Sequence, residues 1–120
     1  MTDVYGRIYE KLEKIGILSV RQYAVIENPP NVPLCVDRLS NDRYAIAHNP
    51  LVDGVMVADP DMEIRVFSEK RTAEPLTFQD RSGRRVVYKE AGKVDLKARN
   101  DLTAFLESWL TKLVNEGYRR

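Results

Sequence analysis

The apolar residues at the two ends of the chain recur with the spacing of amphipathic helices. In the first segment, which precedes Gly16, they are Val4, Ile8, Leu12 and Ile15. In the second, from about Asp95 to Gly117, they are Leu102, Phe105, Leu106, Trp109, Leu110, Leu113 and Val114. Because residues three and four apart share one face of an α-helix, both segments are predicted to be helices packed on a core. Thr2 or Asp3 can cap the first helix, and a glycine ends each.

Between these segments the pattern changes to short apolar runs separated by turn-forming residues. Strands are predicted at about 21–27, 34–39, 43–48, 61–67, 76–79 and 85–88, with a loop at 49–58. Residues 28–31, 40–42 and 80–83 are rich in Asn, Asp, Pro, Ser and Gly, which interrupt strands or turn the chain. The order predicts an α+β fold, in which a mostly antiparallel sheet of five to six strands has the N- and C-terminal helices packed on one face.

Length and composition describe a small globular chain. Its 120 residues fit a single α+β domain over 1–120, and 43% apolar with 31% charged residues is typical of a folded chain rather than a disordered one. The 19 basic and 18 acidic side chains give no long-range attraction to nucleic acid. Cys35 is the only cysteine, which excludes an intramolecular disulfide, and no apolar run is long enough to span a bilayer. These features predict a cytoplasmic protein with no membrane partner.

Residues 59–66 alternate acidic and apolar side chains. The apolar ones are Met62, Ile64 and Val66, and the charged ones are Asp59, Asp61, Glu63 and Arg65. In a strand these two sets lie on opposite faces, so a core strand with an acidic face is predicted. Carboxylates so close together repel one another unless solvent, cationic side chains or a metal ion surrounds them.

The metal alternative is a candidate active site. Asp59, Asp61 and Glu63 are candidate ligands for Mg²⁺, Mn²⁺ or Ca²⁺. The only histidine, His48, is with Asp61 and Glu63 a candidate catalytic residue of a metal-dependent hydrolase or nuclease. The competing interpretation is a solvated or arginine-paired face, in which the Asp59-Pro60 pair only shapes the entry into the strand.

A second candidate site is the basic stretch 81–99. Its candidate nucleic-acid-binding residues are Arg81, Arg84, Arg85 and Lys89. Phe67, Phe78 and Tyr88 are the aromatic residues next to this stretch, so bases could stack on their rings while the cations meet phosphates. The alternative is that Phe78 and Tyr88 pack in the sheet and the basic side chains are solvated.

Several motifs resemble a known family. The segments are 33–34, 46–48, the run Gly54-Val55-Met56-Val57-Ala58-Asp59-Pro60-Asp61-Met62-Glu63, the run 75–79, and the spacing of Leu102, Phe105, Trp109, Leu113 and Gly117. Together they resemble a small prokaryotic domain-of-unknown-function family that also occurs in phages and plasmids. Its pattern is Gly-Asp-Leu-Met-x-Asp-Pro-x-Met-Glu, then Pro-x-Ser-Phe-Gln-Asn-Asp, then a Trp-bearing helix. The chain departs from it at Val55 and at residues 80–81. The resemblance implies an α+β accessory or mobile-element protein without an assigned activity.

The leading functional prediction is a non-enzymatic interaction or accessory module. The chain has no Gly-rich phosphate loop, no Gly-x-Ser-x-Gly, no His-Glu-x-x-His and no Cys-x-x-Cys. A protein partner or a homodimer is therefore expected, and no cofactor is. The metal-dependent hydrolase and the nucleic-acid-binding protein stay as alternatives, with a divalent metal and a nucleic acid as their respective ligands.

Overall fold

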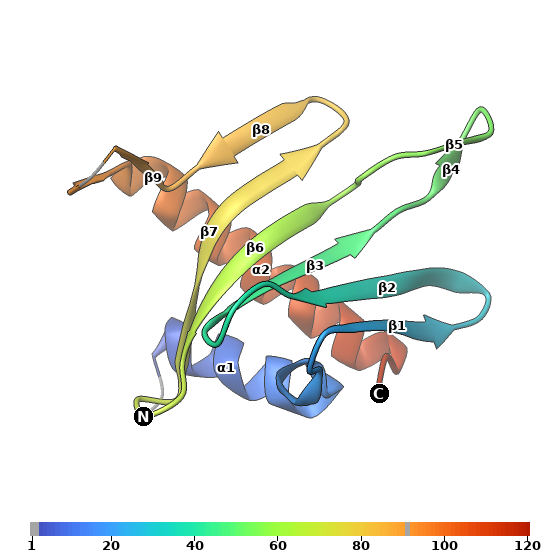
Figure 1. The fold of residues 1–120 in the computed structure, drawn as a ribbon, viewed down its shortest axis with the longest axis horizontal. Helices are drawn as coiled ribbons and strands as arrows, with labels where there is room; N and C mark the ends of the chain where they lie inside the picture. Colours follow the sequence, from blue (N-terminus) through green and yellow to red (C-terminus); the bar gives the residue numbers. More distant parts are fainter. Residues whose placement is uncertain (1–2, 91) are drawn as a thin grey trace.

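The structure is a computed structural model that describes residues 3–90 and 92–120. Its elements are α1 (Val4–Ile15), a 3-10 turn η1 (Ile17–Ser19), β1 (Tyr23–Asn28), β2 (Asn31–Arg38), β3 (Arg43–His48), β4 (Leu51–Val52), β5 (Val55–Met56), β6 (Asp61–Phe67), β7 (Thr72–Asp80), β8 (Gly83–Val86), β9 (Tyr88–Glu90), β10 (Lys93–Val94) and α2 (Leu96–Glu116). Figure 1 shows the long strands side by side in front of α2.

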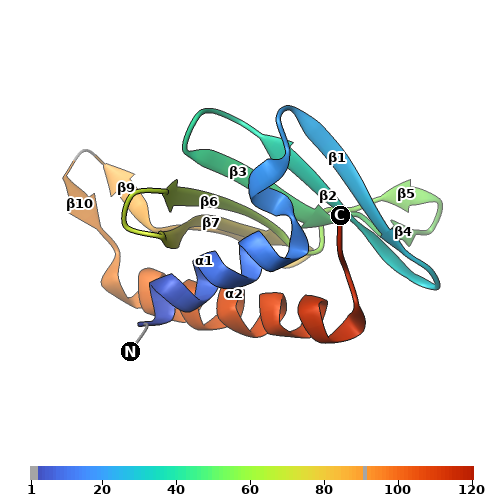
Figure 2. The same cartoon turned by 90° about the horizontal axis from the view of Figure 1, so that it is seen from below.

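One antiparallel sheet of six strands, in the order β1-β2-β3-β6-β7-β8, forms the body of the molecule. Both helices lie on the same face of this sheet (Figure 2). The predicted α+β fold is therefore confirmed. The sheet has six strands, which is the larger of the two predicted numbers. Two short hairpins, β4–β5 and β9–β10, stand apart from the sheet. The first of them occupies the segment that was predicted to be a loop.

The core lies between the sheet and the two helices. Alternate residues of the central strands face the helices and are buried: Leu34 and Val36 from β2, Tyr44 and Ile46 from β3, and Met62, Ile64 and Val66 from β6. They meet Ile8, Leu12 and Ile15 of α1 and Leu106, Leu110 and Leu113 of α2, all of which are at most 1% exposed. The apolar residues that recur with the helical and strand periods in the sequence therefore form one hydrophobic core.

The helix ends follow the sequence signals. The Asp3 carboxylate accepts a hydrogen bond from the Gly6 backbone at 2.9 Å, and Thr2, the other predicted cap, lies outside the described residues. The Asp95 carboxylate caps α2 by accepting from Ala98 at 3.0 Å. Each helix ends at a glycine with φ of 94°, a left-handed conformation that glycine adopts without a steric penalty.

The second face of the sheet carries no helix (Figure 2). Residues of β6 that alternate with the buried ones, Asp61, Glu63 and Arg65, lie on this face and are half-buried. We call it the open face. No helix within residues 3–90 and 92–120 is both long and apolar enough to cross a membrane.

Candidate functional site

The open face brings together three carboxylates. Ala45 on β3 lies directly opposite Glu63 on one side and Asp37 on the other, so these two acids flank a small residue. Asp61 lies two residues before Glu63 on the same strand. Glu63 Oε2 accepts a hydrogen bond from Thr77 Oγ1 at 3.3 Å and lies 3.9 Å from Arg84 Nη2. The acidic row is thus partly compensated by a cation from β8.

The pKa of Asp61 is raised above its ordinary value. Burial is the largest cause, followed by the negative charges of Glu63 and Asp37, while Arg84 acts in the opposite direction. In the folded protein the charged form of Asp61 is therefore disfavoured relative to the unfolded chain. The folded state binds the proton more tightly, so this group lowers the free energy of unfolding as the pH rises from the unfolded to the folded pKa.

Replacing Asp61 with asparagine is expected to raise the free energy of unfolding at pH 7. The amide keeps the shape of the side chain and removes the charge that burial and two neighbouring acids oppose. The gain should shrink as the pH falls through the raised pKa of Asp61, because the wild-type carboxyl is then neutral as well. Urea unfolding of both proteins at neutral and acidic pH measures the difference. An equal difference at every pH would contradict this account.

The three candidate metal ligands and the candidate catalytic residue His48 do not converge. Strand β6 begins at Asp61, so Asp59 precedes it, and the Asp59 backbone N–H donates to the His48 carbonyl at 2.9 Å. His48 lies opposite the buried Leu34 and alternates with Ala47, which places its ring on the helix side of the sheet. Asp61 and Glu63 are on the open face instead. Within residues 3–90 and 92–120, no three His, Cys, Asp or Glu side chains are grouped to hold a metal ion.

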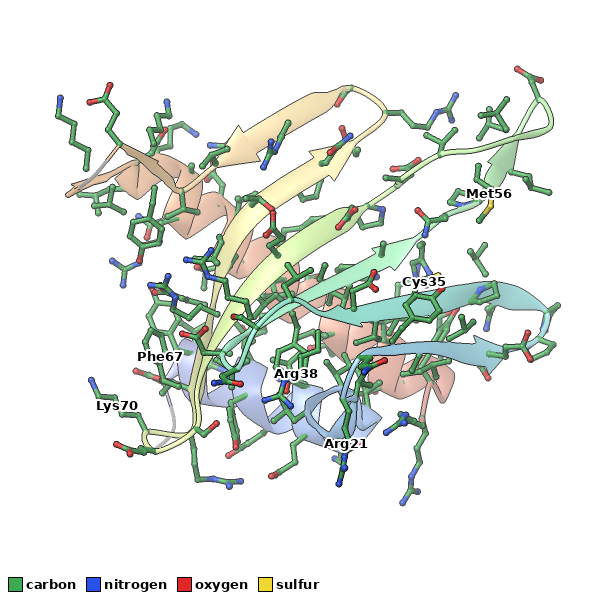
Figure 3. All side chains as sticks on the ribbon, in the orientation of Figure 1. Arg21, Cys35, Arg38, Met56, Phe67 and Lys70 are labelled. Atoms are coloured by element: carbon green, nitrogen blue, oxygen red, sulfur yellow. The ribbon has the colours of Figure 1, made fainter. Side chains whose placement is uncertain are left out.

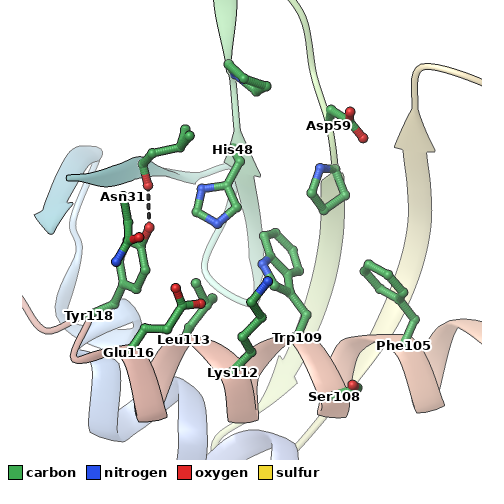
Figure 4. Close-up of a pocket in the computed structure, with 13 residues that line it drawn as sticks. Asn31, His48, Asp59, Phe105, Ser108, Trp109, Lys112, Leu113, Glu116 and Tyr118 are labelled. Carbon is green, nitrogen blue, oxygen red and sulfur yellow. Dashed lines mark hydrogen bonds between the residues drawn. The ribbon is translucent and has the colours of Figure 1, made fainter. Parts of the chain in front are cut away.

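His48 and Asp59 instead line a groove of about 460 Å³ between α2 and the end of the sheet. From α2 it is lined by Phe105, Ser108, Trp109, Lys112, Leu113 and Glu116. The facing wall consists of Asn31, Val32, His48, Pro50, Asp59, Pro60 and Tyr118. We call this cavity the α2 groove, and Figure 4 shows His48 projecting between Tyr118 and Trp109 above the helix. Its volume lies in the range of small-ligand and side-chain pockets.

The floor of the groove is a cluster of aromatic rings. The centroid of the His48 ring is 5.5 Å from that of Trp109, with an edge-on geometry, and 5.7 Å from that of Tyr118. Phe105 continues the cluster at 6.1 Å from Trp109. The Tyr118 hydroxyl donates to the Val32 carbonyl, and burial raises its pKa. Aromatic rings fixed in this way form a preorganised apolar surface.

The hydrogen bond of His48 determines which of its two ring nitrogens carries the proton. Nδ1 lies 3.0 Å from the Pro33 carbonyl oxygen, which can only accept, so Nδ1 carries the proton. In the neutral ring, Nε2 is therefore the acceptor. The ring is oriented by the backbone of β2 and offers a hydrogen-bond acceptor to an occupant of the groove.

A family model for a domain of unknown function, DUF6908, matches residues 3–119. The chain belongs to the DUF6908 family. The match agrees with the resemblance seen in the sequence to a family without an assigned activity, and it covers the sheet, both helices and the α2 groove. The chain matches no curated protein and no solved structure.

In this DUF6908 domain the charged side chains of the α2 groove differ from those of the basic stretch. Among the described residues, Asp59, Lys112 and Glu116 form no ion pair within 4 Å. The basic stretch is mostly paired: Arg85 lies 3.1 Å from Asp101, Lys89 lies 3.1 Å from Asp95, and Arg84 approaches Glu63 at 3.9 Å. The groove therefore holds charges that an occupant can meet.

Three of the candidate nucleic-acid-binding residues, Arg84, Arg85 and Lys89, line one cavity of about 340 Å³ beside Asp95, although their side chains start from different faces of the strands. Arg84 lies opposite Gln79 in the β7–β8 ladder and Arg85 lies opposite Phe78, so the two arginines are on different faces of the sheet. Arg81 lies in the turn that connects these strands. Phe78 packs edge-on against Phe105 with centroids 5.0 Å apart, while Tyr88 donates a hydrogen bond to Glu74 at 2.7 Å. In this DUF6908 domain the cavity thus gathers three of the basic candidates, while neither Phe78 nor Tyr88 is among its lining residues.

The α2 half of the groove was not predicted from the sequence. Trp109 was interpreted as a core residue, and it is only 7% exposed, yet it also forms the groove floor. Phe105, Lys112 and Glu116 recur at helical spacing, so the sequence alone places them on one face of α2. Asp37 was missed as well, although its position opposite Ala45 follows from the predicted hairpin.

Proposed function

We propose that this protein is a non-enzymatic interaction module that binds an apolar segment of a protein partner in the α2 groove. The observation that carries the proposal is the combination of an aromatic floor with charged side chains that have no ion-pair partner among the described residues. Tyrosine, tryptophan and other large side chains in a central pocket supply most of the binding energy at protein interfaces, and charges at the rim select the partner.

The exposure of the groove residues supports binding. Phe105 and Val32 are 39% and 38% exposed, although both lie beside the buried Trp109. An apolar segment that covers them removes this surface from water, which is favourable by about 25 cal/mol for each Å². Lys112 can pair with a carboxylate of such a segment, and Asp59 and Glu116 can pair with a cation.

The hydrogen bonding of the groove favours binding over catalysis. Ser108, His48 and Asp59 all line it, as a nucleophile, a base and an acid would. Among the described residues no hydrogen bond joins any two of these side chains, and Nδ1 of His48 is engaged by the Pro33 carbonyl rather than by a carboxylate. A catalytic triad requires both links, since the carboxylate orients the base and the base activates the nucleophile.

The cellular setting is a further part of the proposal. We propose that the module acts in the cytoplasm of a prokaryote, as an accessory protein of a mobile element. The support is the resemblance carried by residues 54–63 and 75–79, together with a single cysteine that requires no oxidising compartment.

Titration with synthetic peptides tests the binding function. Trp109 is the only tryptophan of the chain, so its emission reports directly on occupation of the groove. Apolar peptides with an acidic residue should change the emission saturably, and Phe105→Asp should weaken their binding by about tenfold or more. Phe67→Asp is the matched control, because Phe67 is 37% exposed against 39% for Phe105 and lies outside the groove.

Two results would contradict the proposal. One is the absence of a saturable change with any peptide of this class when the protein is monomeric. The other is an equal loss of binding in Phe105→Asp and Phe67→Asp while circular dichroism shows both variants folded. Binding of short DNA or RNA at low salt, lost on replacing Arg84 and Arg85 but unaffected by Phe105→Asp, would favour the nucleic-acid alternative instead.

A further inference from the structure

The hairpin β4–β5 projects from the end of the sheet as an arm, which we define as residues Leu51 to Met56 (Figure 1). Leu51 pairs with Met56 and Val52 with Val55, and Asp53 and Gly54 form the turn with φ of 52° and 80°. Positive φ at both central residues is the signature of a tight two-residue turn that matches the twist of a hairpin, and Asp-Gly favours it. The arm is therefore a defined structural element.

Large apolar side chains of the arm are exposed. Leu51 is 70% exposed, Met56 65% and Val55 62%, the highest values among the exposed large apolar residues of the described chain. Leu51 and Met56 lie directly opposite each other, so they share one face of the hairpin. Figure 3 shows Met56 on this arm, away from the helices. Such clustered apolar exposure marks an interaction surface.

The arm and the α2 groove are neighbours. The Val57 backbone donates to the Pro50 carbonyl at 3.0 Å and so closes the base of the arm. Pro50 and Asp59, which flank the arm in sequence, both line the groove. The arm is an apolar projection, and the α2 groove beside it has an aromatic floor. In a dimer with two-fold symmetry, the arm of each copy can therefore enter the groove of the other copy, which makes the same contact twice.

The arm and the groove offer one contact between opposite charges, although the groove also carries the carboxylates of Asp59 and Glu116. Asp53 is exposed in the turn of the arm, and Lys112 is exposed on the groove side of α2. Neither forms an ion pair within 4 Å among the described residues. When an arm enters a groove, its turn carboxylate is attracted by Lys112 and repelled by Asp59 and Glu116, so only a register that seats Asp53 at Lys112 is favourable.

We propose that the occupant of the α2 groove is the β4–β5 arm of a second copy of this chain, exchanged reciprocally around a two-fold axis. This inference rests on the proposed binding function of the groove and names its partner. Leu51 and Met56 contact the aromatic floor of the opposite groove, and Asp53 of each copy pairs with the partner's Lys112.

Sedimentation equilibrium of the wild type and charge variants tests the exchange. Asp53→Lys and Lys112→Asp should each weaken the dimer by about tenfold or more, since each homodimer then brings like charges together twice. An equimolar mixture of the two variants should dimerise like the wild type, because each arm then meets a groove of opposite charge. Leu51→Asp with Met56→Asp should give a monomer, whereas Leu39→Asp, at a 50% exposed position outside arm and groove, should not.

The outcomes separate this inference from the proposed function. A wild type that is monomeric at high micromolar concentration, yet binds peptides in the groove, overturns the dimer and leaves the binding function intact. A dimer that is insensitive to the arm variants also overturns it, as does a mixture of charge variants that remains monomeric. A monomer whose groove binds no peptide contradicts both.

Discussion

Replacing Ile46 with lysine is expected to leave most of the chain unfolded at 25 °C. Ile46 is completely buried on the helix side of β3, so the substitution removes a large apolar contact and places an ammonium group in the core. Loss of the apolar contact alone costs about 2–5 kcal/mol, and an unpaired buried charge adds several more. The total is comparable with the free energy of unfolding of a small domain, about 5–15 kcal/mol. Far-ultraviolet circular dichroism and urea unfolding measure the result.

The neighbouring residue supplies the control. Ala45 lies on the open face, directly between Asp37 and Glu63 on the adjacent strands. Ala45→Lys is expected to fold and to be as stable as the wild type or slightly more so, because each opposite-charge pair across strands contributes about 0.2–1 kcal/mol. If both lysine variants unfold equally, the assignment of the two faces of β3 is wrong.

Replacing Leu106 with alanine is expected to lower the free energy of unfolding by about 2–5 kcal/mol. Leu106 is fully buried in the middle of α2, where it meets the sheet, so its truncation leaves a cavity. The same change at Leu96, which is 60% exposed at the start of the same helix, should alter stability by no more than about 0.5 kcal/mol. Urea unfolding of the two variants gives the comparison, and equal losses would contradict the position of α2 on the core.

The helices and the order of the strands were predictable because several local signals agree. In α1 the apolar period, an acidic cap and a terminal glycine all point to the same boundaries, and α2 repeats this combination. The turns at 28–31, 40–42 and 80–83 divide the strands in the same way. Where propensity, periodicity and turn-forming residues indicate the same element, tertiary packing rarely changes its type or its boundaries.

Several features were not predicted, among them the β9–β10 hairpin, and three of them have a physical reason. Strand β7 begins at Thr72 rather than 76, because Pro75, which lacks a donor, is accommodated at an irregularity in the β6–β7 pairing. The arm was predicted to be a loop, since two residues per strand are too few to show a period, although Asp53-Gly54 between apolar residues was a hairpin signal. Asp59 does not share the open face with Asp61 and Glu63, because β6 begins only at Asp61.

The candidate site depends on contacts that no local pattern contains. The sequence shows that α2 has an apolar stripe, but it does not show which end of the sheet meets the second half of that helix. The approach of His48 to Trp109 and Tyr118 joins residues 61 and 70 positions apart, and it depends on how the whole sheet lies across the helix. This is why the sequence indicated the individual residues but did not predict that they form a groove.

Strands β3 and β6 are paired directly, with Ala47 opposite Asp61, although the arm lies between them in the chain. The arm is therefore an insertion at the end of a hairpin, outside the ladder that aligns these two strands. Loop insertions at such positions change the closure entropy only slightly, because the cost grows slowly with loop length. One hairpin can then be substituted for another without a change in the sheet register, so the exposed apolar surface at this end of the molecule can vary while the six-stranded sheet stays the same.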